Sequence, residues 1–136
     1  MNDKNEKYLY DNWPKLFGQK SLPMSKSCMY WGICVGDGWF NILCWMCGEI
    51  QKWCDQNNTQ VEFTQIKEKF GLLRVYTNTS NDAIDDIIMI AEEISSKQCE
   101  ICGRRGKLRE IDWMVTLCWR CNVVRKFKKI KLIFGF

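Results

Sequence analysis

The sequence predicts an α+β domain with two main helices and a β-hairpin, followed by a small metal-binding module. Apolar residues recur at helical spacing in two stretches, 39–54 and 82–97, and a run rich in β-forming residues lies between them at 60–77. Two Cys-x-x-Cys pairs fall within residues 97–136. With 136 residues, of which 46% are apolar, the chain is long enough to bury a real core.

The N-terminal part is expected to be irregular. Residues 1–27 have no clear period, and one short helix is predicted at 13–17, where Pro14 suits a first helical turn. The segment 21–25 is predicted to be an extended connector. Gly36-Asp37-Gly38 predicts a turn, with Asp37 as the N-cap of the helix that follows.

The first main helix is predicted from an apolar stripe on 39–54. Its members share one helical face: Trp39, Leu43, Met46, Ile50 and Trp53. We expect Trp39, Trp53 and Trp113 to be packed in the core. Trp45 instead falls on the polar face of this helix, where an exposed tryptophan is unusual.

A β-hairpin and the second main helix follow. The hairpin is predicted at 61–67 and 72–77, around a Phe70-Gly71 turn. The stretch 79–81 offers N-cap residues for a helix that ends near Lys97. Its buried stripe consists of isoleucines and one alanine: Ile84, Ile87, Ile88, Ala91 and Ile94.

The cysteine spacing in the last part of the chain predicts a structural zinc site. Cys99 and Cys102 form the first pair, and Cys118 and Cys121 form the second, with fifteen residues between Cys102 and Cys118. Four thiolates at this spacing are typical of a tetrahedral Zn²⁺ site. Glycines at 103 and 106 allow the sharp backbone reversal that the first pair needs.

The order of elements around these cysteines favours a treble-clef-like zinc finger. A second hairpin is predicted at 107–110 and 113–117, and helical spacing continues after Cys121. A zinc ribbon would place the second pair on another hairpin instead. The apolar stripe of this last helix is typical of one packed on protein, and its members are Val123, Phe127, Ile130 and Phe134.

Charge divides the chain into two parts. Residues 1–96 contain nine Lys/Arg and thirteen Asp/Glu, a formal charge of −4, whereas residues 97–136 contain eleven and three, a formal +8. We therefore expect an acidic α+β body at 1–96 and a basic zinc-finger module at 97–136, packed together as one compact unit.

The composition argues against catalysis and against membrane insertion. The chain contains no histidine, which removes Ser-His-Asp and Cys-His mechanisms and the usual catalytic zinc sites, so we expect a protein that is not an enzyme. No stretch reaches the 18 apolar residues of a membrane span. Nine cysteines without a secretion signal indicate a reducing compartment, and we expect a cytoplasmic protein.

Several strings resemble a family of small bacteriophage and prophage proteins. They are CMYWG at 28–32, GDGWF at 36–40, IKEKFGLLR at 66–74, CEICG at 99–103 and TLC at 116–118. Relatives of this kind often carry histidine at the fourth ligand position, where this chain has Cys121, and its lysine-rich extension after Asn122 is longer. The resemblance implies a phage or prophage origin, and a cytosolic location in the host cell, but no mechanism.

Two binding hypotheses follow. In the first, the protein binds and modulates, by inhibition, a host or defence protein, with Trp45 as an aromatic anchor. In the second, the basic module binds nucleic acid through Arg104, Arg105, Arg125, Lys126, Lys128 and Lys129. A solvated basic face, a docking site for the acidic body, and contact with an anionic membrane surface remain alternatives for these side chains.

Thiol redox chemistry at Cys44 and Cys47 is the least favoured hypothesis. Reactive Cys-x-x-Cys pairs lie at helix N-termini, where the dipole lowers the thiol pKa, but Cys44 lies more than a turn inside its predicted helix. We expect Cys28, Cys34, Cys44, Cys47 and Cys54 to be reduced and mostly buried, as small apolar core residues.

Overall fold

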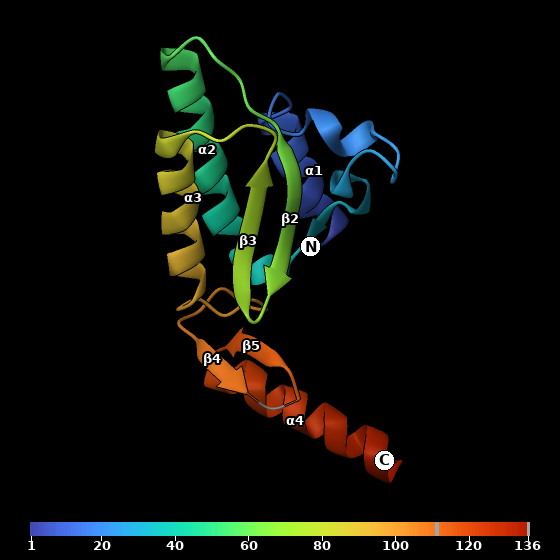
Figure 1. The fold of residues 1–136 in the computed structure, drawn as a ribbon. Coiled ribbons are helices and arrows are strands. Elements are labelled where there is room, and N and C mark those ends of the chain that lie inside the picture. Colours follow the sequence, from blue (N-terminus) through green and yellow to red (C-terminus); the bar gives the residue numbers. More distant parts are fainter. Residues whose placement is uncertain (111, 136) are drawn as a thin grey trace.

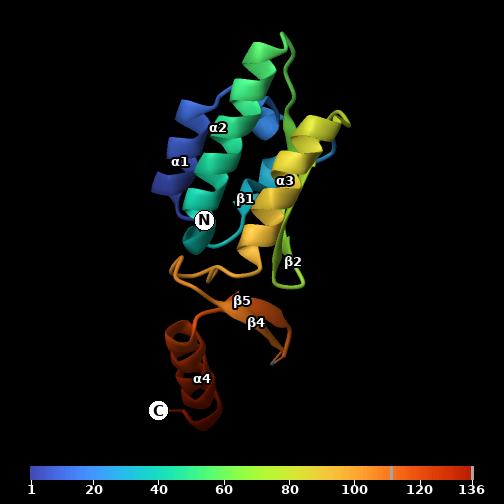
Figure 2. The ribbon, with the colours of Figure 1, turned by 90° about the vertical axis from the view of Figure 1, so that its left-hand side faces the viewer.

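The protein has an α+β fold. The computed structural model describes residues 1–110 and 112–135. Within them the helices are α1 (Asp3–Asn12), α2 (Phe40–Gln56), α3 (Asp82–Ser95) and α4 (Trp119–Phe134). The strands are β1 (Ile33–Cys34), β2 (Phe63–Lys69), β3 (Leu72–Thr77), β4 (Lys107–Glu110) and β5 (Met114–Leu117). Figures 1 and 2 show α1 to α3 and β1 to β3 forming one body, with β4, β5 and α4 at one end of it.

A three-stranded sheet forms one layer of the body. β2 pairs antiparallel with β3 and parallel with β1, with Ile66 opposite both Val75 and Ile33. The β2–β3 turn has positive φ at Phe70 (54°) and Gly71 (80°), the left-handed pair that a tight hairpin turn needs. β1 has only two residues, too few for the sequence pattern to reveal, so the third strand was not predicted.

The core lies between this sheet and the pair formed by α2 and α3. Figure 2 shows the two helices side by side. Leu43 and Ile50 of α2, Ile84 of α3 and Trp39 just before α2 are fully buried, whereas Ile94, predicted in the buried stripe of α3, is 39% exposed. The bounds of α2 and α3 agree with the predicted helices to within about two residues at each end, because both stripes are long and regular.

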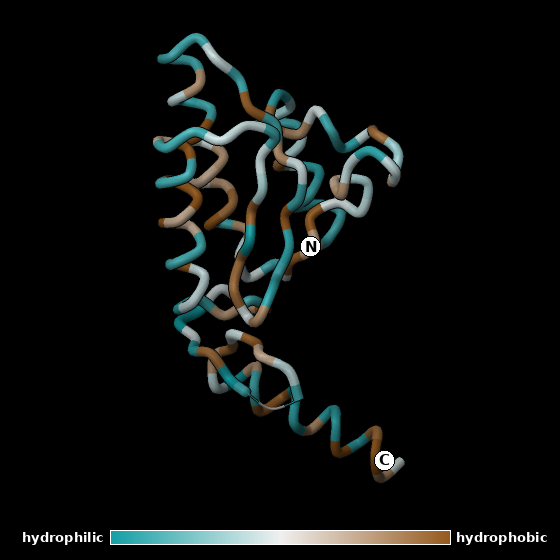
Figure 3. Tube along the Cα trace, in the orientation of Figure 1, coloured by the Kyte–Doolittle hydropathy of each residue, from teal (hydrophilic) through white to brown (hydrophobic). Residues whose placement is uncertain are grey.

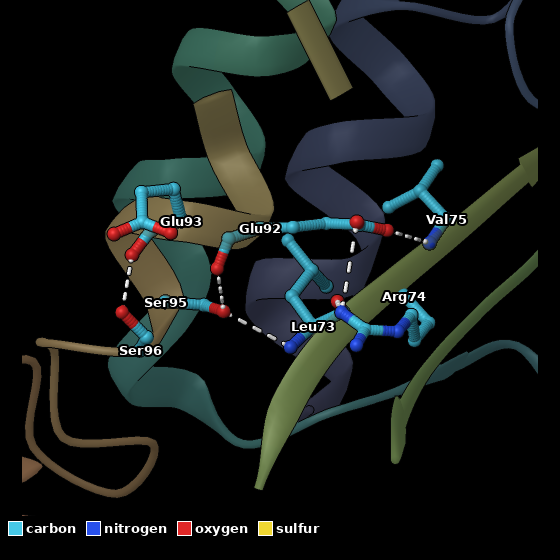
Figure 4. Close-up of polar contacts among 7 residues, drawn as sticks. All are labelled: Leu73, Arg74, Val75, Glu92, Glu93, Ser95 and Ser96. Atoms are coloured by element: carbon cyan, nitrogen blue, oxygen red, sulfur yellow. Dashed lines mark hydrogen bonds and ion pairs between the residues drawn. The ribbon is translucent and has the colours of Figure 1, made fainter. Parts of the chain in front are cut away.

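Hydrogen bonds fix α3 to strand β3. The amide of Leu73 donates to Ser95 Oγ at 3.0 Å, and the amide of Val75 donates to a carboxylate oxygen of Glu92 at 3.2 Å (Figure 4). Glu92 also lies 3.6 Å from the guanidinium of Arg74. Since β3 is an edge strand, these side chains satisfy amides that no further strand pairs with.

The N-terminal prediction was wrong. A full helix, α1, occupies Asp3–Asn12 and begins at Asn2, whose side chain accepts from the amide of Asn5. Residues 13–17 form a turn instead of the predicted helix, and 21–25 contain bends and turns instead of an extended connector. Leu9 is the single buried side chain of α1, so the helix carries almost no apolar stripe for a sequence pattern to detect.

Asp37 also has a different role from the predicted one. It lies at the start of a short 3-10 helix, Asp37–Trp39, and Trp39 is the N-cap of α2. Its carboxylate accepts hydrogen bonds from the Asn2 amide at 2.8 Å and from Asn5 Nδ2 at 3.2 Å. Asp37 therefore ties the start of α1 to the start of α2.

The C-terminal part consists of a β-hairpin and a helix. β4 and β5 pair antiparallel, with Lys107 opposite Leu117, and α4 packs against β5. Two core predictions were wrong here. Trp113 is 64% exposed, and the stripe expected to pack on protein is open to solvent, with Phe127 67% exposed. In Figures 1 and 2, α4 extends away from the body.

Two glycines let this C-terminal part dock on the body. The amide of Gly38 donates to the carbonyl of Glu100 at 2.8 Å, and the indole of Trp39 donates to the carbonyl of Gln98 at 2.8 Å. A Cβ at Gly38 would lie 2.1 Å from the Cys99 carbonyl oxygen, and one at Gly36 would lie 2.3 Å from that of Glu100. The GDGW string is therefore a backbone docking surface.

Within the described residues, none of the helices has the length and apolarity needed to cross a membrane.

Substituting Gly38 with Ala should destabilise the protein by about 2 kcal/mol, because the backbones of residues 38 and 99 must separate. The matched control is Gly48→Ala in the middle of α2, where the nearest atom to a new Cβ is 3.8 Å away. That change should stabilise the protein by up to about 1 kcal/mol through helix propensity. Urea unfolding measures both, and equal effects of the two substitutions would contradict the docking role of Gly38.

Candidate metal centre

Four cysteines from two separate segments meet at one point. Cys99 and Cys102 lie in the loop between α3 and β4, and Cys118 and Cys121 lie at the junction of β5 with α4. One ligand atom from each lies within 4.8 Å of all the others. The structure therefore brings together all four of the predicted ligands.

Backbone hydrogen bonds shape the first pair into a tight reversal. The amide of Cys99 donates to the carbonyl of Arg104 at 2.7 Å, and the amide of Gly103 donates back to the carbonyl of Cys99 at 2.9 Å. Gly103 has a φ of 79°, which a side chain would strain. The amide of Glu100 donates to the carbonyl of Thr116 at 3.0 Å, which holds this loop against β5.

The second pair is held by the first turn of α4. Cys118 is the N-cap of the helix, and its Sγ accepts from the amide of Cys121 at 3.4 Å. A sulfur at a helix N-terminus lies near the positive end of the dipole, which favours the thiolate. The helix thus positions two ligands and stabilises the charge on one of them.

The spacing of the sulfurs fits a tetrahedral metal ion. Cys102 Sγ lies 3.6 Å from Cys118 Sγ. Metal–sulfur bonds of about 2.3 Å in a tetrahedron place neighbouring sulfurs about 3.8 Å apart. A disulfide would need about 2.05 Å, and all four cysteines are free. The cluster is therefore compatible with one bound metal ion.

The protonation of these thiols also favours a cation. The Cys121 amide lowers the pKa of the Cys118 thiol to about 7. Burial raises the pKa values of Cys102 and Cys121, and their hydrogen bonds with neighbouring thiols contribute. Four thiolates this close repel one another, so a metal ion is needed to hold all of them deprotonated.

The apolar core beside the cluster is very small. The buried apolar side chains of this part are Cys99, Leu117 and Cys118, with Val115 and Cys121 packed against them. Two of these three buried side chains, Cys99 and Cys118, belong to the cysteine cluster. This part by itself has little buried apolar surface with which to offset the entropy of ordering it, so a bound metal ion would stabilise it.

The basic residues predicted for nucleic acid do not all remain free. Arg125 lies over the ring of Trp113, 4.4 Å from its centroid, and Lys129 donates to a carboxylate oxygen of Asp112 at 2.6 Å. The other four basic side chains are exposed: Arg104 and Arg105 on the cysteine loop, Lys126 and Lys128 on α4. No sequence pattern predicted the contact between Arg125 and Trp113, because the two residues are twelve positions apart and lie in different elements.

Trp45 lies on α2 and is 40% exposed. The helical period placed it on the polar face, and its exposure agrees with that placement. The cysteines of the body follow their prediction less well, because Cys28 and Cys34 are exposed. Both lie before α2, in segments where the apolar residues show no helical or strand periodicity from which burial could be predicted.

Comparison of the chain with protein-family models, with curated proteins and with solved structures yields no match.

Replacing Cys102 with Ser should abolish metal binding, which we expect at one equivalent per chain in the unmodified protein. Residues 97–136 should then lose their structure, while the larger core of the body persists. Metal analysis by mass spectrometry and amide hydrogen exchange measure the two effects. The matched control, Cys28→Ser, removes an exposed thiol outside the cluster and should leave both unchanged. Full metal content in the Cys102→Ser protein would contradict the ligand assignment.

The body cysteines should differ in reactivity towards iodoacetamide. Burial raises the pKa of the Cys44 thiol and, much more, that of Cys47, so less thiolate is present near neutral pH and alkylation is slow. Exposed Cys34 should be labelled first, Cys44 later, and buried Cys47 last. Labelling of Cys44 should accelerate as the pH rises towards its raised pKa. Peptide mass spectrometry over a time course checks this order, and labelling of Cys47 as fast as Cys34 would refute it.

Proposed function

We propose that this chain is a zinc-stabilised protein without enzymatic activity that acts by binding another protein. Zinc is the metal that a reduced, closed set of four thiolates favours, since tetrahedral sulfur sites select zinc or iron over magnesium and calcium. Mass spectrometry of the intact, purified protein identifies the ion. Iron in place of zinc would overturn this part of the proposal.

The order of elements supports a treble-clef-like arrangement of the zinc module. A cysteine loop carries the first two ligands, the β4–β5 hairpin follows, and the first turn of α4 carries Cys121. Zinc in this module serves the fold, because all four positions of a tetrahedral site are filled by protein sulfur. No coordination position remains for water or substrate.

The exposure of tryptophan carries the binding proposal. Four of the seven tryptophans are exposed: Trp31 (63%), Trp45 (40%), Trp113 (64%) and Trp119 (68%). Tryptophan dominates the energetic centres of protein interfaces because it removes a large apolar area from water at a small entropic cost. A chain that leaves most of its tryptophans in solvent therefore has several candidate anchors for a partner.

The partner that we propose is a protein of a host cell or of its defence systems, bound in the cytosol and inhibited. The resemblance of the GDGW, IKEKFGLLR and cysteine strings to phage and prophage proteins supports this context. Trp45 is the proposed anchor, because it is the exposed tryptophan of α2, a helix whose opposite face is packed in the core.

Nucleic-acid binding is the second candidate. The observation that favours it is the charge of α4, which carries six Lys/Arg and no Asp/Glu. Intramolecular contacts already engage Arg125 and Lys129, which reduces the set that phosphates can reach. Affinity purification from host lysate, with and without nuclease, separates the candidates. Stoichiometric recovery of a protein despite nuclease supports the first, and nuclease-sensitive recovery supports the second.

Substituting Trp45 with Ala should weaken binding of the recovered protein partner by about 2 kcal/mol or more, as loss of an interface anchor does. The matched control is Lys52→Ala, an exposed residue of the same helix without a ring. Neutralising Arg125, Lys126, Lys128 and Lys129 together should have little effect on that affinity. Titration calorimetry measures all three. A silent Trp45→Ala protein, together with salt-dependent binding to DNA or RNA that the neutralised protein loses, would favour the nucleic-acid candidate.

A further inference from the structure

The apolar stripe of α4 lies on the side of the helix opposite to the side that packs against β5. Cys121, Asn122 and Arg125 are the side chains of α4 that are buried or half-buried. Val123, Phe127 and Ile130 follow one another by four and three residues and are 36%, 67% and 45% exposed. A helix stripe of this kind is stable in water only when another surface covers it.

The chain itself carries a second exposed stripe, on α3. Ile84 and Ile88 face the core, whereas Ile87, Ile90 and Ile94 follow by three and four residues along an adjoining face, on which Ile87 also packs against the core. Ile90 is 47% and Ile94 39% exposed, and Ile87 is half-buried. Read from its C-terminal end, this stripe has the same four-then-three spacing as the stripe of α4. An antiparallel pair therefore brings the three residues of one stripe opposite the three residues of the other.

The two helices carry charges of opposite sign, although Glu92 of α3 and both Arg125 and Lys129 of α4 are turned to partners in their own chain. α3 carries five Asp/Glu and no Lys/Arg, whereas α4 carries six Lys/Arg and no Asp/Glu. An antiparallel pair also places the opposite ends of the two helix dipoles together. Two copies of α4 packed on each other would instead bring like charges into contact, which is unfavourable.

The two stripes cannot meet within one chain as it is folded. α4 packs on β5 and leads away from the body, while α3 lies on the body's outer side (Figures 1 and 2). Figure 3 shows hydrophobic positions recurring along α4 out to its far end. A shallow groove lined by Val124, Phe127 and Ile130 between lysines runs beside the stripe. It can receive the branched ends of isoleucine side chains.

We propose that α4 of one chain docks antiparallel on α3 of a second copy. In this register Val123, Phe127 and Ile130 lie opposite Ile94, Ile90 and Ile87, over about 10 Å of helix at 1.5 Å per residue. Two-fold symmetry repeats the contact, since each copy supplies one α3 and one α4. A single helix pair of this length is small for a stable interface, and the repeat doubles the buried surface. This dimer is independent of the protein partner proposed for Trp45.

Sedimentation of the zinc-loaded full-length chain over a range of concentrations tests the dimer. The expected mass rises from one chain to two. Phe127→Asp and Ile90→Asp should each raise the dissociation constant about 30-fold or more, which is about 2 kcal/mol. The matched controls, Leu132→Asp and Met89→Asp, alter exposed apolar residues of the same helices away from the stripes and should leave it within about threefold. Zinc content and circular dichroism establish that each variant is folded.

A charge exchange tests the register. Lys126 of α4 and Glu93 of α3 come to lie on the same side of the pair, within one helical turn of each other. Lys126→Glu alone, and Glu93→Lys alone, should each weaken the dimer about tenfold. An equimolar mixture of the two should recover most of the affinity, since it offers one native and one reversed ion pair. In a dimer of either single variant, both α3–α4 contacts place like charges at positions 93 and 126, which is why each variant alone should bind more weakly than the mixture.

Four results would overturn the proposal. They are a monomer at the highest soluble concentration, a dimer indifferent to Phe127→Asp, equal effects of the stripe variants and their controls, and mixtures no tighter than the pure charge variants. A monomer that sediments with phosphatidylserine vesicles, and loses this with Phe127→Asp, would assign the stripe to a membrane surface instead.

Discussion

The cluster of four sulfurs is the constraint on which the C-terminal part of this protein depends. Among the described residues of 97–135, the buried apolar cluster consists of three side chains, and two of them, Cys99 and Cys118, belong to the cysteine cluster. In the proposed zinc module, bonds from the four sulfurs to one ion would take the place of the hydrophobic core that so short a segment cannot build. Because Cys118 also caps α4, the position of the cysteine cluster is tied to the start of the last helix.

The cysteine cluster takes its position from contacts with the body, whereas the body has a hydrophobic core of its own. The loop of Cys99 is held between β5 and the backbone of Gly38, and the indole of Trp39 reaches the carbonyl next to it. Trp39 is also a fully buried core residue at the start of α2. One side chain therefore belongs to the hydrophobic core and to the docking surface, which couples the position of the metal centre to the packing of the body.

Opposite charge and matching apolar stripes give the two halves of the chain complementary surfaces that the fold keeps apart. α3 contributes an acidic helix held rigidly on β3 through Glu92 and Ser95. α4 contributes a basic helix that packs on β5 near its start and is tied to Asp112 through Lys129. An arrangement of this kind favours intermolecular contacts, since neither stripe can be covered inside one chain.

The sequence by itself determined the elements whose pattern is local and regular. Apolar spacing placed α2 and α3, and the Cys-x-x-Cys spacing identified all four members of the cluster, because both signals repeat over short distances along the chain. It missed α1, whose single buried residue is Leu9, and β1, which has two residues. Neither leaves a period long enough to detect.

Only the tertiary structure decided which apolar residues are covered. Val123 and Phe127 have the spacing of a packed helix, and Trp113 has the composition of a core residue, yet all three are exposed. Periodicity tells which side chains share a face, but burial depends on whether another element of the chain reaches that face. Here α4 begins at the cysteine cluster at one end of the body and leads away from the body, which leaves the face open.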